Sequence, residues 1–292
     1  ALMQDAGDVT HWSASAAVLD AAGLTAFNAG RLYFNVHTPA NPGGELRGQI
    51  LPSTVQLAFN SLASAQEVPA VISAATGTVA TTFNAVTGTI NVRVSTTGVS
   101  DAVAAHVHDG FAGTNGGVLV PLTQDAADVN SWSANEAALG ASGVAAFQAG
   151  SLYINVHTPA NPGGELRGQV TPAGVQVVFS MLDGGQEVPA FVTTAAGIGA
   201  VTFNSNNNAL QVNVNTSGVD DAIAAHIHRA AVGVNGAVQI TLVQSLTDVS
   251  LWQAENTVLD DANVTAFNAG ELYLNVHTPA NPGGEIRGQI TP

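Results

Sequence analysis

The chain has 292 residues, a formal net charge of −15 and 9% charged side chains, which argues against nucleic acid or anionic membranes as partners. It has no cysteine, so disulfides and thiolate metal sites are excluded. It also has no run of about 18 apolar residues, so no membrane span is expected. All six basic residues are arginine, and a chain with so few tryptic sites suits an exposed extracellular life.

One sequence motif occurs three times in the chain. NVHTPANPGGELRGQ occurs at residues 35–49 and 155–169, and returns at 275–289 with a single change, Ile286 for leucine. The offset is 120 residues each time (35 to 155, 155 to 275). Small-unit solenoids have periods of about 20–50 residues, so this period indicates tandem domains. We expect residues 1–52 to be the second half of an incomplete repeat, and 53–172 and 173–292 to be complete repeats.

The first half of each complete repeat carries strand signals. Apolar and polar residues alternate in 55–59, 78–83 and 89–94, and again in 210–215. Alternation with a period of two is typical of strands that bury one face. Clusters of Asn, Gly, Ser and Thr, such as residues 204–208, predict the turns between these strands.

The second half opens with a short predicted strand at 117–122. Two Ala-rich pieces, 136–139 and 144–150, predict short helices, and the final glycine is placed to end the second one. Strands at 152–157 and 165–170, joined by the PANPGG loop, complete the repeat. Many short strands separated by polar turns predict an all-β fold: tandem antiparallel Greek-key β-sandwich or barrel domains with short helical inserts.

The strand pattern predicts where the histidines point. In residues 152–157 the apolar side chains face the core, so His157 lies on the outer face. If the last two strands pair as a hairpin, Arg167 shares that polar face. His106 and His108 flank Val107 and share one side of their strand, so three imidazoles are expected to meet outside the sheet.

Three neutral imidazoles suit copper, with zinc as the alternative. A His-x-His pair on a strand presents both rings on one side, and a third histidine completes a trigonal or open tetrahedral set. The competing interpretation is that these side chains only hydrogen-bond loop backbone and hold the repeat together. The incomplete repeat has only His37 and cannot form the site alone. The predicted metal ligands are His106, His108 and His157 in the first complete repeat, and His226, His228 and His277 in the second.

Two arginines lie beside these histidines in the sequence. Arg167 and Arg287 are expected either to clamp a loop, as in an ion pair of Arg167 with Glu165, or to guide an anion towards a metal. No Ser-His-Asp, phosphate-loop or paired-carboxylate arrangement stands out, so a non-enzymatic role is preferred.

The repeated motifs resemble the chordin-type (CHRD) domain. The resemblance rests on Gln-Glu-Val-Pro at Gln66–Pro69, on Ala-His-Val/Ile-His followed by Asn115-Gly116, and on the late Leu-Tyr-x-Asn-Val-His-Thr…Gly-Glu-Leu/Ile-Arg-Gly-Gln. It covers the whole chain as two full copies and a half. It implies a β-rich, tandemly repeated module of secreted or cell-surface proteins.

A weaker resemblance is to copper/zinc superoxide dismutase. That family also has a His-Val-His copper pair, a third copper-ligand histidine at the end of a strand, and then a Gly-rich loop with an arginine that guides the substrate anion. His106, His108, His157 and Arg167 follow this order. The bridging histidine, zinc loop and disulfide of that family have no counterpart here, so the resemblance implies a site for copper alone.

An unpaired half repeat exposes strand edges and an apolar face. We therefore expect either that it pairs with copies of the same chain or that the chain is a slice of a longer array. Both alternatives favour a homo-oligomer or filament. The leading expectation is a secreted or cell-surface structural or adhesive repeat protein with three-His copper sites. The alternatives are a copper-dependent, dismutase-like oxidoreductase and a pure binding module for a surface ligand.

Overall fold

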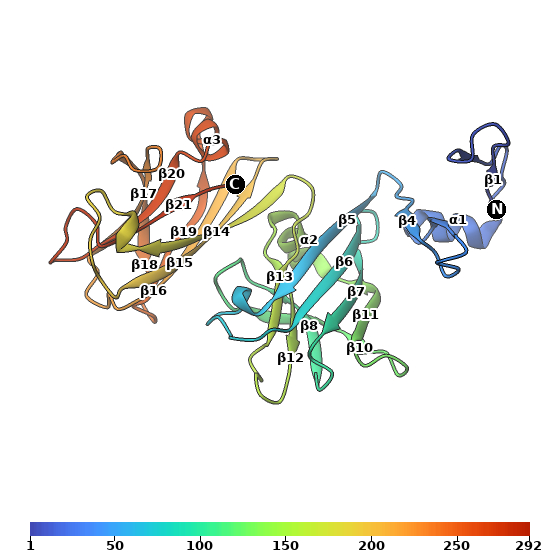
Figure 1. Cartoon of the computed structure of the whole chain (residues 1–292), viewed down its shortest axis with the longest axis horizontal. Coiled ribbons are helices and arrows are strands. Elements are labelled where there is room, and N and C mark those ends of the chain that lie inside the picture. Colours follow the sequence, from blue (N-terminus) through green and yellow to red (C-terminus); the bar gives the residue numbers. More distant parts are fainter. The chain divides into compact units, whose positions relative to one another are not determined.

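The computed structural model describes residues 1–292, which group into two compact units (Figure 1). The smaller unit holds residues 1–56 with 84–86, and the larger holds 57–83 with 87–292. None of the helices has the length and apolar character needed to cross a membrane. The expected all-β, antiparallel architecture is confirmed, and each unit is described separately below.

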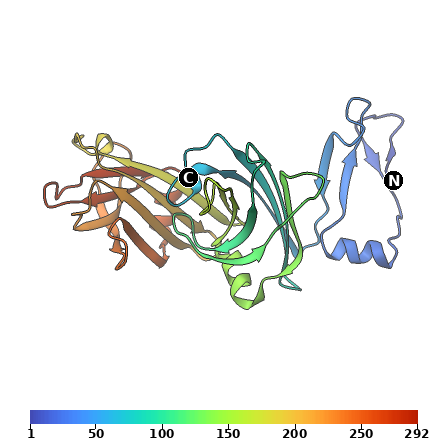
Figure 2. The same ribbon diagram turned by 90° about the horizontal axis from the view of Figure 1, so that it is seen from below.

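Eight antiparallel strands close into a barrel in the C-terminal repeat, called here the second barrel (Figure 2). The strand order is β14-β15-β16-β19-β18-β17-β20-β21, so strands from the two halves of the repeat interleave. Its strands are β14 (Val175–Asp183), β15 (Ala196–Asn204), β16 (Ala209–Ser217), β17 (Ala224–Arg229), β18 (Ala237–Gln244), β19 (Leu251–Val258), β20 (Leu272–His277) and β21 (Ile286–Ile290).

The preceding repeat, called the first barrel, has the same strand order in one nine-stranded sheet, β10-β11-β7-β6-β5-β13-β12-β8-β9. Here β9 and β10 together take the place of β18. Its strands are β5 (Val55–Ala63), β6 (Thr76–Asn84), β7 (Thr89–Thr97), β8 (Ala104–Asp109), β9 (Gly117–Pro121), β10 (Thr123–Gln124), β11 (Ser131–Ala138), β12 (Leu152–His157) and β13 (Leu166–Gln169).

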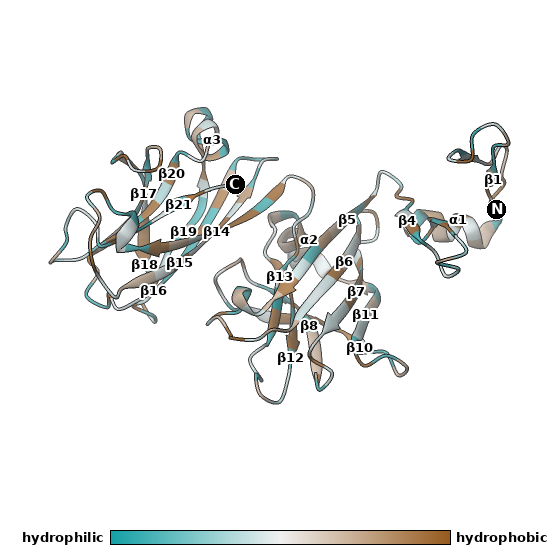
Figure 3. Cartoon of the chain, in the orientation of Figure 1, coloured by the Kyte–Doolittle hydropathy of each residue, from teal (hydrophilic) through white to brown (hydrophobic).

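Hydrophobic and hydrophilic residues, brown and teal in Figure 3, are interspersed along the strands. The hydrophobic side chains fill the two barrel cores. Val92, Val107 and Ile154 are fully buried in the first barrel. The predicted strand at 55–59 is confirmed, but its phase differs from the simple alternation of Val55, Leu57 and Phe59. Ala58 lies in the core, whereas Phe59 is 72% exposed. Pairing with β6 decides which residues of β5 face the core, because a short run in which nearly every residue is apolar does not determine this by itself.

Short helices accompany the sheets: α2 (Gly140–Ala149) in the first barrel, α3 (Asp261–Asn268) in the second, and the 3₁₀ turns η1 (Ser64–Gln66) and η2 (Gly184–Gln186). As predicted, α2 ends at Gly150, whose φ of 77° provides the left-handed cap. Phe147 of α2 stacks on Phe83 with ring centroids 4.4 Å apart, which anchors the helix on the core.

The helix predicted at residues 136–139 is wrong. Residues 136–138 end β11, where Ala137 pairs with Ile90 after a register shift, and Leu139 precedes α2. Glu136 has a φ of 47° at this irregularity. Pairing with β7 outweighs the helix preference of alanine here, because propensity is a weak prior against tertiary contacts.

The smaller unit contains β1 (Met3–Gln4), β2 (Trp12–Ser13), α1 (Ala21–Asn28), β3 (Tyr33–Val36) and β4 (Leu46–Gln49), in two separate two-stranded sheets. The corresponding pairs in the second barrel are bridged by β17 on one side and by β14–β16 on the other. Without such neighbours, Phe34 is 51% and Leu46 67% exposed, whereas the matching Ile154 and Leu166 are fully buried. This unit therefore keeps its local hairpins but lacks a closed core.

Candidate metal centre

Strand pairing brings the predicted histidines together. Strand β8 runs antiparallel to β12, with His108 opposite Tyr153 and His106 opposite Asn155. His157 follows at the end of β12, on the same face. Val107, between the pair, is fully buried in the core, so both imidazoles point out of the barrel as predicted.

One nitrogen from each of the three rings converges on a common point. The ligand atoms of His106, His108 and His157 lie within 4.8 Å of one another. Nδ1 of His106 is 3.1 Å from Nε2 of His157. The second barrel repeats the arrangement with His226, His228 and His277, where the corresponding distance is 3.0 Å.

Backbone carbonyls set the tautomers of two rings in each site. Nδ1–H of His108 donates to the Gly116 carbonyl at 3.0 Å, and Nδ1–H of His157 donates to the Pro162 carbonyl at 3.1 Å. Each ring must therefore present the lone pair of Nε2 towards the convergence point. Nε2 of His108 is buried and has no hydrogen-bond partner, and the same holds for His228.

Burial also holds these imidazoles in the neutral form. Loss of hydration lowers the pKa of all six rings below the usual value. The pKa of His277 falls to about 4, because the neighbouring His226 adds to the effect of burial. Near pH 7 the three lone pairs of each site are therefore available to a cation, without proton competition.

The face that carries the histidines lies outside the barrel, yet it is not open to solvent. Tyr153 is 1% and Asn155 2% exposed. Loop contacts account for this: the Gly116 amide donates to the Tyr153 hydroxyl at 3.1 Å, and the Asn155 side-chain amide donates to the carbonyl of Gly163 at 3.4 Å. Loops on both sides of the histidines thus form a covered polar layer over the sheet.

Arg167 lies inside this layer and is only 1% exposed. Its guanidinium stacks over Tyr153, 3.6 Å from the ring centroid, and donates to the carbonyls of Thr114 at 2.8 Å and Phe111 at 3.0 Å. Arg287 repeats these contacts over Tyr273 and on the carbonyls of Val234 and Ala231, a geometry that clamps a loop. An anion arriving from solvent would not reach either guanidinium directly.

The expected ion pair between Arg167 and Glu165 is wrong. Glu165 instead accepts hydrogen bonds from the hydroxyls of Ser73 and Thr158, both at 2.6 Å. These bonds lower the pKa of Glu165 and tie the PANPGG loop to the segment after η1. Glu165 lies one residue before β13, and its carboxylate is taken up by these loop hydroxyls.

From the sequence, Glu67 is expected only to fix a strand end, but in the structure its charge acts on Arg167. Glu67 is 6% exposed and accepts from the Asn155 side-chain amide at 3.2 Å. Burial raises its pKa to about 7, although the positive charge of Arg167 acts in the opposite direction. Glu187 is placed equivalently beside Asn275, with its pKa also raised to about 7. The repetition of Gln-Glu-Val-Pro-Ala in both repeats was the available signal.

These glutamates predict a pH-dependent stability difference. A folded-state pKa raised above the unfolded value contributes stability at pH 4.5 and below, and that contribution is lost as the pH rises through 7. Glutamine cannot ionise, so the Glu67→Gln plus Glu187→Gln variant escapes this loss. Its unfolding free energy, measured relative to that of the unchanged chain, should therefore be higher at pH 8 than at pH 5 by roughly 1–3 kcal/mol per site. Urea unfolding at both pH values measures this gain.

Comparing the two chains at each pH cancels the opposite titration of the histidines, whose lowered pKa values favour folding at higher pH. Glu165→Gln plus Glu285→Gln is the matched control, because the pKa values of those carboxylates are lowered rather than raised. If the Glu67→Gln plus Glu187→Gln variant differed from the unchanged chain by the same unfolding free energy at pH 5 and at pH 8, the raised pKa values of Glu67 and Glu187 would be contradicted.

The sequence of the chain was compared with those of known proteins. The sequence profile of the CHRD domain matches residues 2–50, 59–170 and 178–290. Chordin from Danio rerio is 33% identical over 153 residues, which covers 48% of this chain and 16% of chordin, so the chain spans only a small part of that protein's length. No solved structure gives a significant match. With profile matches along nearly its whole length, the chain belongs to the CHRD domain family as a tandem repeat protein.

Proposed function

We propose that the chain is an extracellular structural or adhesive repeat protein in which each complete barrel holds one copper ion through three histidines. The observation that carries the metal site is the convergence of three imidazole nitrogens within 4.8 Å, found twice in the chain. Imidazole suits both copper and zinc, and among divalent ions copper binds nitrogen ligands most tightly. Zinc is therefore the alternative occupant.

The unpartnered nitrogens support this proposal. A buried polar atom without a partner costs about 1–3 kcal/mol, and Nε2 of His108 and of His228 are two such atoms. The short distance between His106 Nδ1 and His157 Nε2 brings two further lone pairs together unless one nitrogen carries a proton. A cation among the three nitrogens would satisfy all of them at once.

Electron paramagnetic resonance of the Cu(II)-loaded chain tests the ligand set. We expect one type of copper signal with hyperfine structure from imidazole nitrogens, growing linearly until two equivalents are bound per chain. His37→Ala is the control and should leave the spectrum unchanged, because His37 has no histidine neighbours of this kind. A spectrum without nitrogen hyperfine structure would count against the three-His site.

The extracellular location rests on the family and on composition. The matched relative carries the name chordin, and the chain has no lysine and only six arginines, so it offers few sites to trypsin-like proteases. Fractionation of cells that produce the full-length protein tests the location: recovery in the medium or on the surface supports it, and retention inside the cell contradicts it.

Self-association is the second part of the proposal. Phe34, Leu46 and Leu24 of the smaller unit are all more than half exposed, and an apolar face of this kind favours a protein partner. We propose that this half repeat pairs with a copy of the same chain. Sedimentation velocity should show species larger than the monomer, and Phe34→Ser plus Leu46→Ser should reduce them. A monomer at all concentrations would contradict this.

A dismutase-like reaction is the second candidate function. It is favoured by the three-ligand set, which leaves a coordination position free for a small molecule. Because Arg167 and Arg287 are 1% exposed and occupied by loop carbonyls, attraction of an anion would depend on other groups. Superoxide consumption by the copper-loaded chain tests this candidate, and a rate no higher than that of the metal-free chain would rule it out.

A further inference from the structure

A loop of the first barrel docks onto the second barrel within the larger unit. The side-chain amide of Asn213 donates to the carbonyl of Ala112 at 2.8 Å, and that of Asn215 donates to the carbonyl of Gly113 at 2.9 Å. Residues 111–114, and their counterparts 231–234 in the second barrel, are called the docking loop below. The strand surface that receives this loop is called the receiving groove.

The docking loop and the receiving groove fit closely. A Cβ added to Gly113 would lie 2.9 Å from Cβ of Asn213 and 3.0 Å from Cβ of Ala200, and its φ of +85° also favours glycine. Ala112, Asn213 and Ala200 are each 1% exposed. Glycine at this position thus allows the loop backbone to reach the sheet and meet both asparagines.

The docking loop of the second barrel has the same shape but no partner. The amide of Val234 donates to Ala231 at 3.1 Å, as Thr114 does to Phe111, and Arg287 holds the loop as Arg167 holds its counterpart. Gly233 has a φ of +77°, yet an added Cβ would meet no atom within 4 Å. Val232, at the position of Ala112, is 72% exposed.

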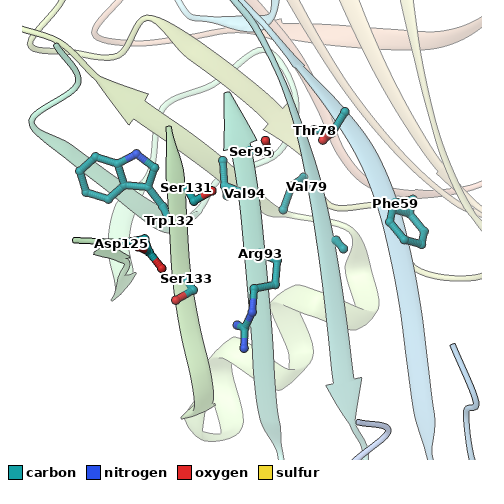
Figure 4. Close-up of a pocket in the computed structure, with 11 residues that line it drawn as sticks. Phe59, Thr78, Val79, Arg93, Val94, Ser95, Asp125, Ser131, Trp132 and Ser133 are labelled. Carbon is teal, nitrogen blue, oxygen red and sulfur yellow. The ribbon is translucent and has the colours of Figure 1, made fainter. Parts of the chain in front are cut away.

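The first barrel carries the complementary receiving groove, also unpartnered. Ala80, Arg93 and Ser95 stand where the second barrel has Ala200, Asn213 and Asn215, and they line one pocket with Phe59 (Figure 4). Arg93 and Ser95 are both exposed, unlike the buried Asn213. The guanidinium of Arg93 already donates to the carbonyls of Val92 and Ala134 and to the side-chain oxygen of Asn135, which leaves two of its five N–H groups for a further acceptor.

We propose that the docking loop of the second barrel of one chain binds the receiving groove of the first barrel of another copy. The carbonyls of Val232 and Gly233 accept hydrogen bonds from Arg93 and Ser95, which replace the two asparagine amides of the contact within the chain. The apolar Val232 packs towards the exposed ring of Phe59. The argument for a second copy as occupant is that the same pair of surfaces already meets once between consecutive barrels.

This contact joins two different surfaces, so it is heterologous and repeats from copy to copy into an open filament. It rests on the proposal that copies of this chain associate, but it requires neither the half repeat nor a metal. Ser133, beside Arg93 in the groove, stands where the second barrel has the larger Gln253. That difference gives room to Val232, which is larger than Ala112.

Site-specific cross-linking tests the contact, since the chain has no cysteine of its own. One variant carries Ser95→Cys and a second carries Val232→Cys. With a short bismaleimide reagent and a chelator present, the equimolar mixture should give a cross-linked heterodimer, and each variant alone about tenfold less dimer. Adding Ala80→Leu to the groove variant should lower the heterodimer yield about tenfold, because the larger side chain would occupy the place of the loop glycine.

Asn215→Cys plus Ala112→Cys in one chain is the matched positive control, because these positions correspond to Ser95 and Val232. Both lie in the contact seen within the chain, where Asn215 bonds Gly113 and Ala112 bonds Asn213, and they should cross-link there. Full reaction of this control without any heterodimer in the mixture would overturn the proposal. The proposal would also be overturned if each variant alone gave as much dimer as the mixture, or if Ala80→Leu left the heterodimer yield unchanged. Phe34→Ser plus Leu46→Ser should leave the cross-link intact, which separates this contact from association through the half repeat.

Discussion

Replacing His108 and His228 together by alanine is expected to weaken copper binding at both barrels by roughly 100-fold or more. Even the outer-shell partner of a metal ligand is worth about 10–100-fold in affinity, and these two residues would be ligands. They carry the buried nitrogens without partners, so no other side chain compensates for their loss. Competition titration against a copper-binding dye measures the change.

The fold should survive this substitution. Each ring gives up one hydrogen bond to a loop carbonyl and one stacking contact, which for His108 is with Tyr153 at 4.8 Å, whereas the barrel core is untouched. Near-ultraviolet circular dichroism should therefore stay close to that of the unchanged chain. His106→Ala plus His226→Ala, at half-buried positions, should weaken copper binding in the same way. Unchanged copper affinity in both double variants would show that these histidines are not ligands.

Removing the buried arginine of the second barrel should be the most damaging single change to stability. Arg287→Ala leaves the carbonyls of Val234 and Ala231 and the side-chain oxygen of Gln289 without their donor, and it removes the cation stacked over Tyr273. Losing one side of a buried charged network costs about 3–5 kcal/mol. Urea unfolding at pH 7 is the measurement, with the loss expected in the transition of the second barrel.

The chain supplies its own control for this experiment. Arg47 occupies the same place in the half repeat and stacks 3.7 Å over Tyr33, but Arg47 is exposed and donates to no loop carbonyl. Arg47→Ala should therefore cost less than about 1 kcal/mol. Similar losses for Arg287→Ala and Arg47→Ala would mean that the loop clamp contributes little, and that the stacking contact carries the effect.

Strand alternation explains why much of the site could be predicted from the sequence. The side chains of His106 and His108 must share a face because Val107 between them is apolar, and the same rule places His157 beside Tyr153 and Asn155. The 120-residue period (35 to 155) then fixes the second set without further assumptions. Both inferences use only local chain geometry, which is why they survive in the three-dimensional structure.

The features that could not be predicted depend on contacts between distant segments. Alternation shows that Asn155 faces outwards, but not that loops bury it to 2% exposure. The carbonyls that Arg167 meets belong to residues 53 and 56 positions away, and Glu67 lies 100 positions before it (67 to 167). Likewise, residues 136–138 form the end of β11 because β7 offers backbone partners to Ala137 and Ala138, which no local propensity reveals.

The glycines of the docking loop illustrate the same limit. Gly113 and Gly233 occupy equivalent positions of the repeat and have nearly the same backbone conformation. Only the structure distinguishes them, since one backbone packs against Ala200 and Asn213 and the other meets nothing. Equivalent positions of the repeat thus differ in their surroundings. The docking loop of the first barrel is in contact with the second barrel, whereas the docking loop of the second barrel and the receiving groove of the first barrel have no partner.

Metal content is the most direct test of the central claim that each complete barrel is a three-His metal site. The chain should be isolated without chelators or metal-affinity steps and analysed by mass spectrometry of the elements. The account predicts two copper or zinc ions per chain, one for each set of converging histidines. A chain that holds no metal, and takes up none when copper or zinc is added, would contradict it and leave the histidines as hydrogen-bonding partners of the loops.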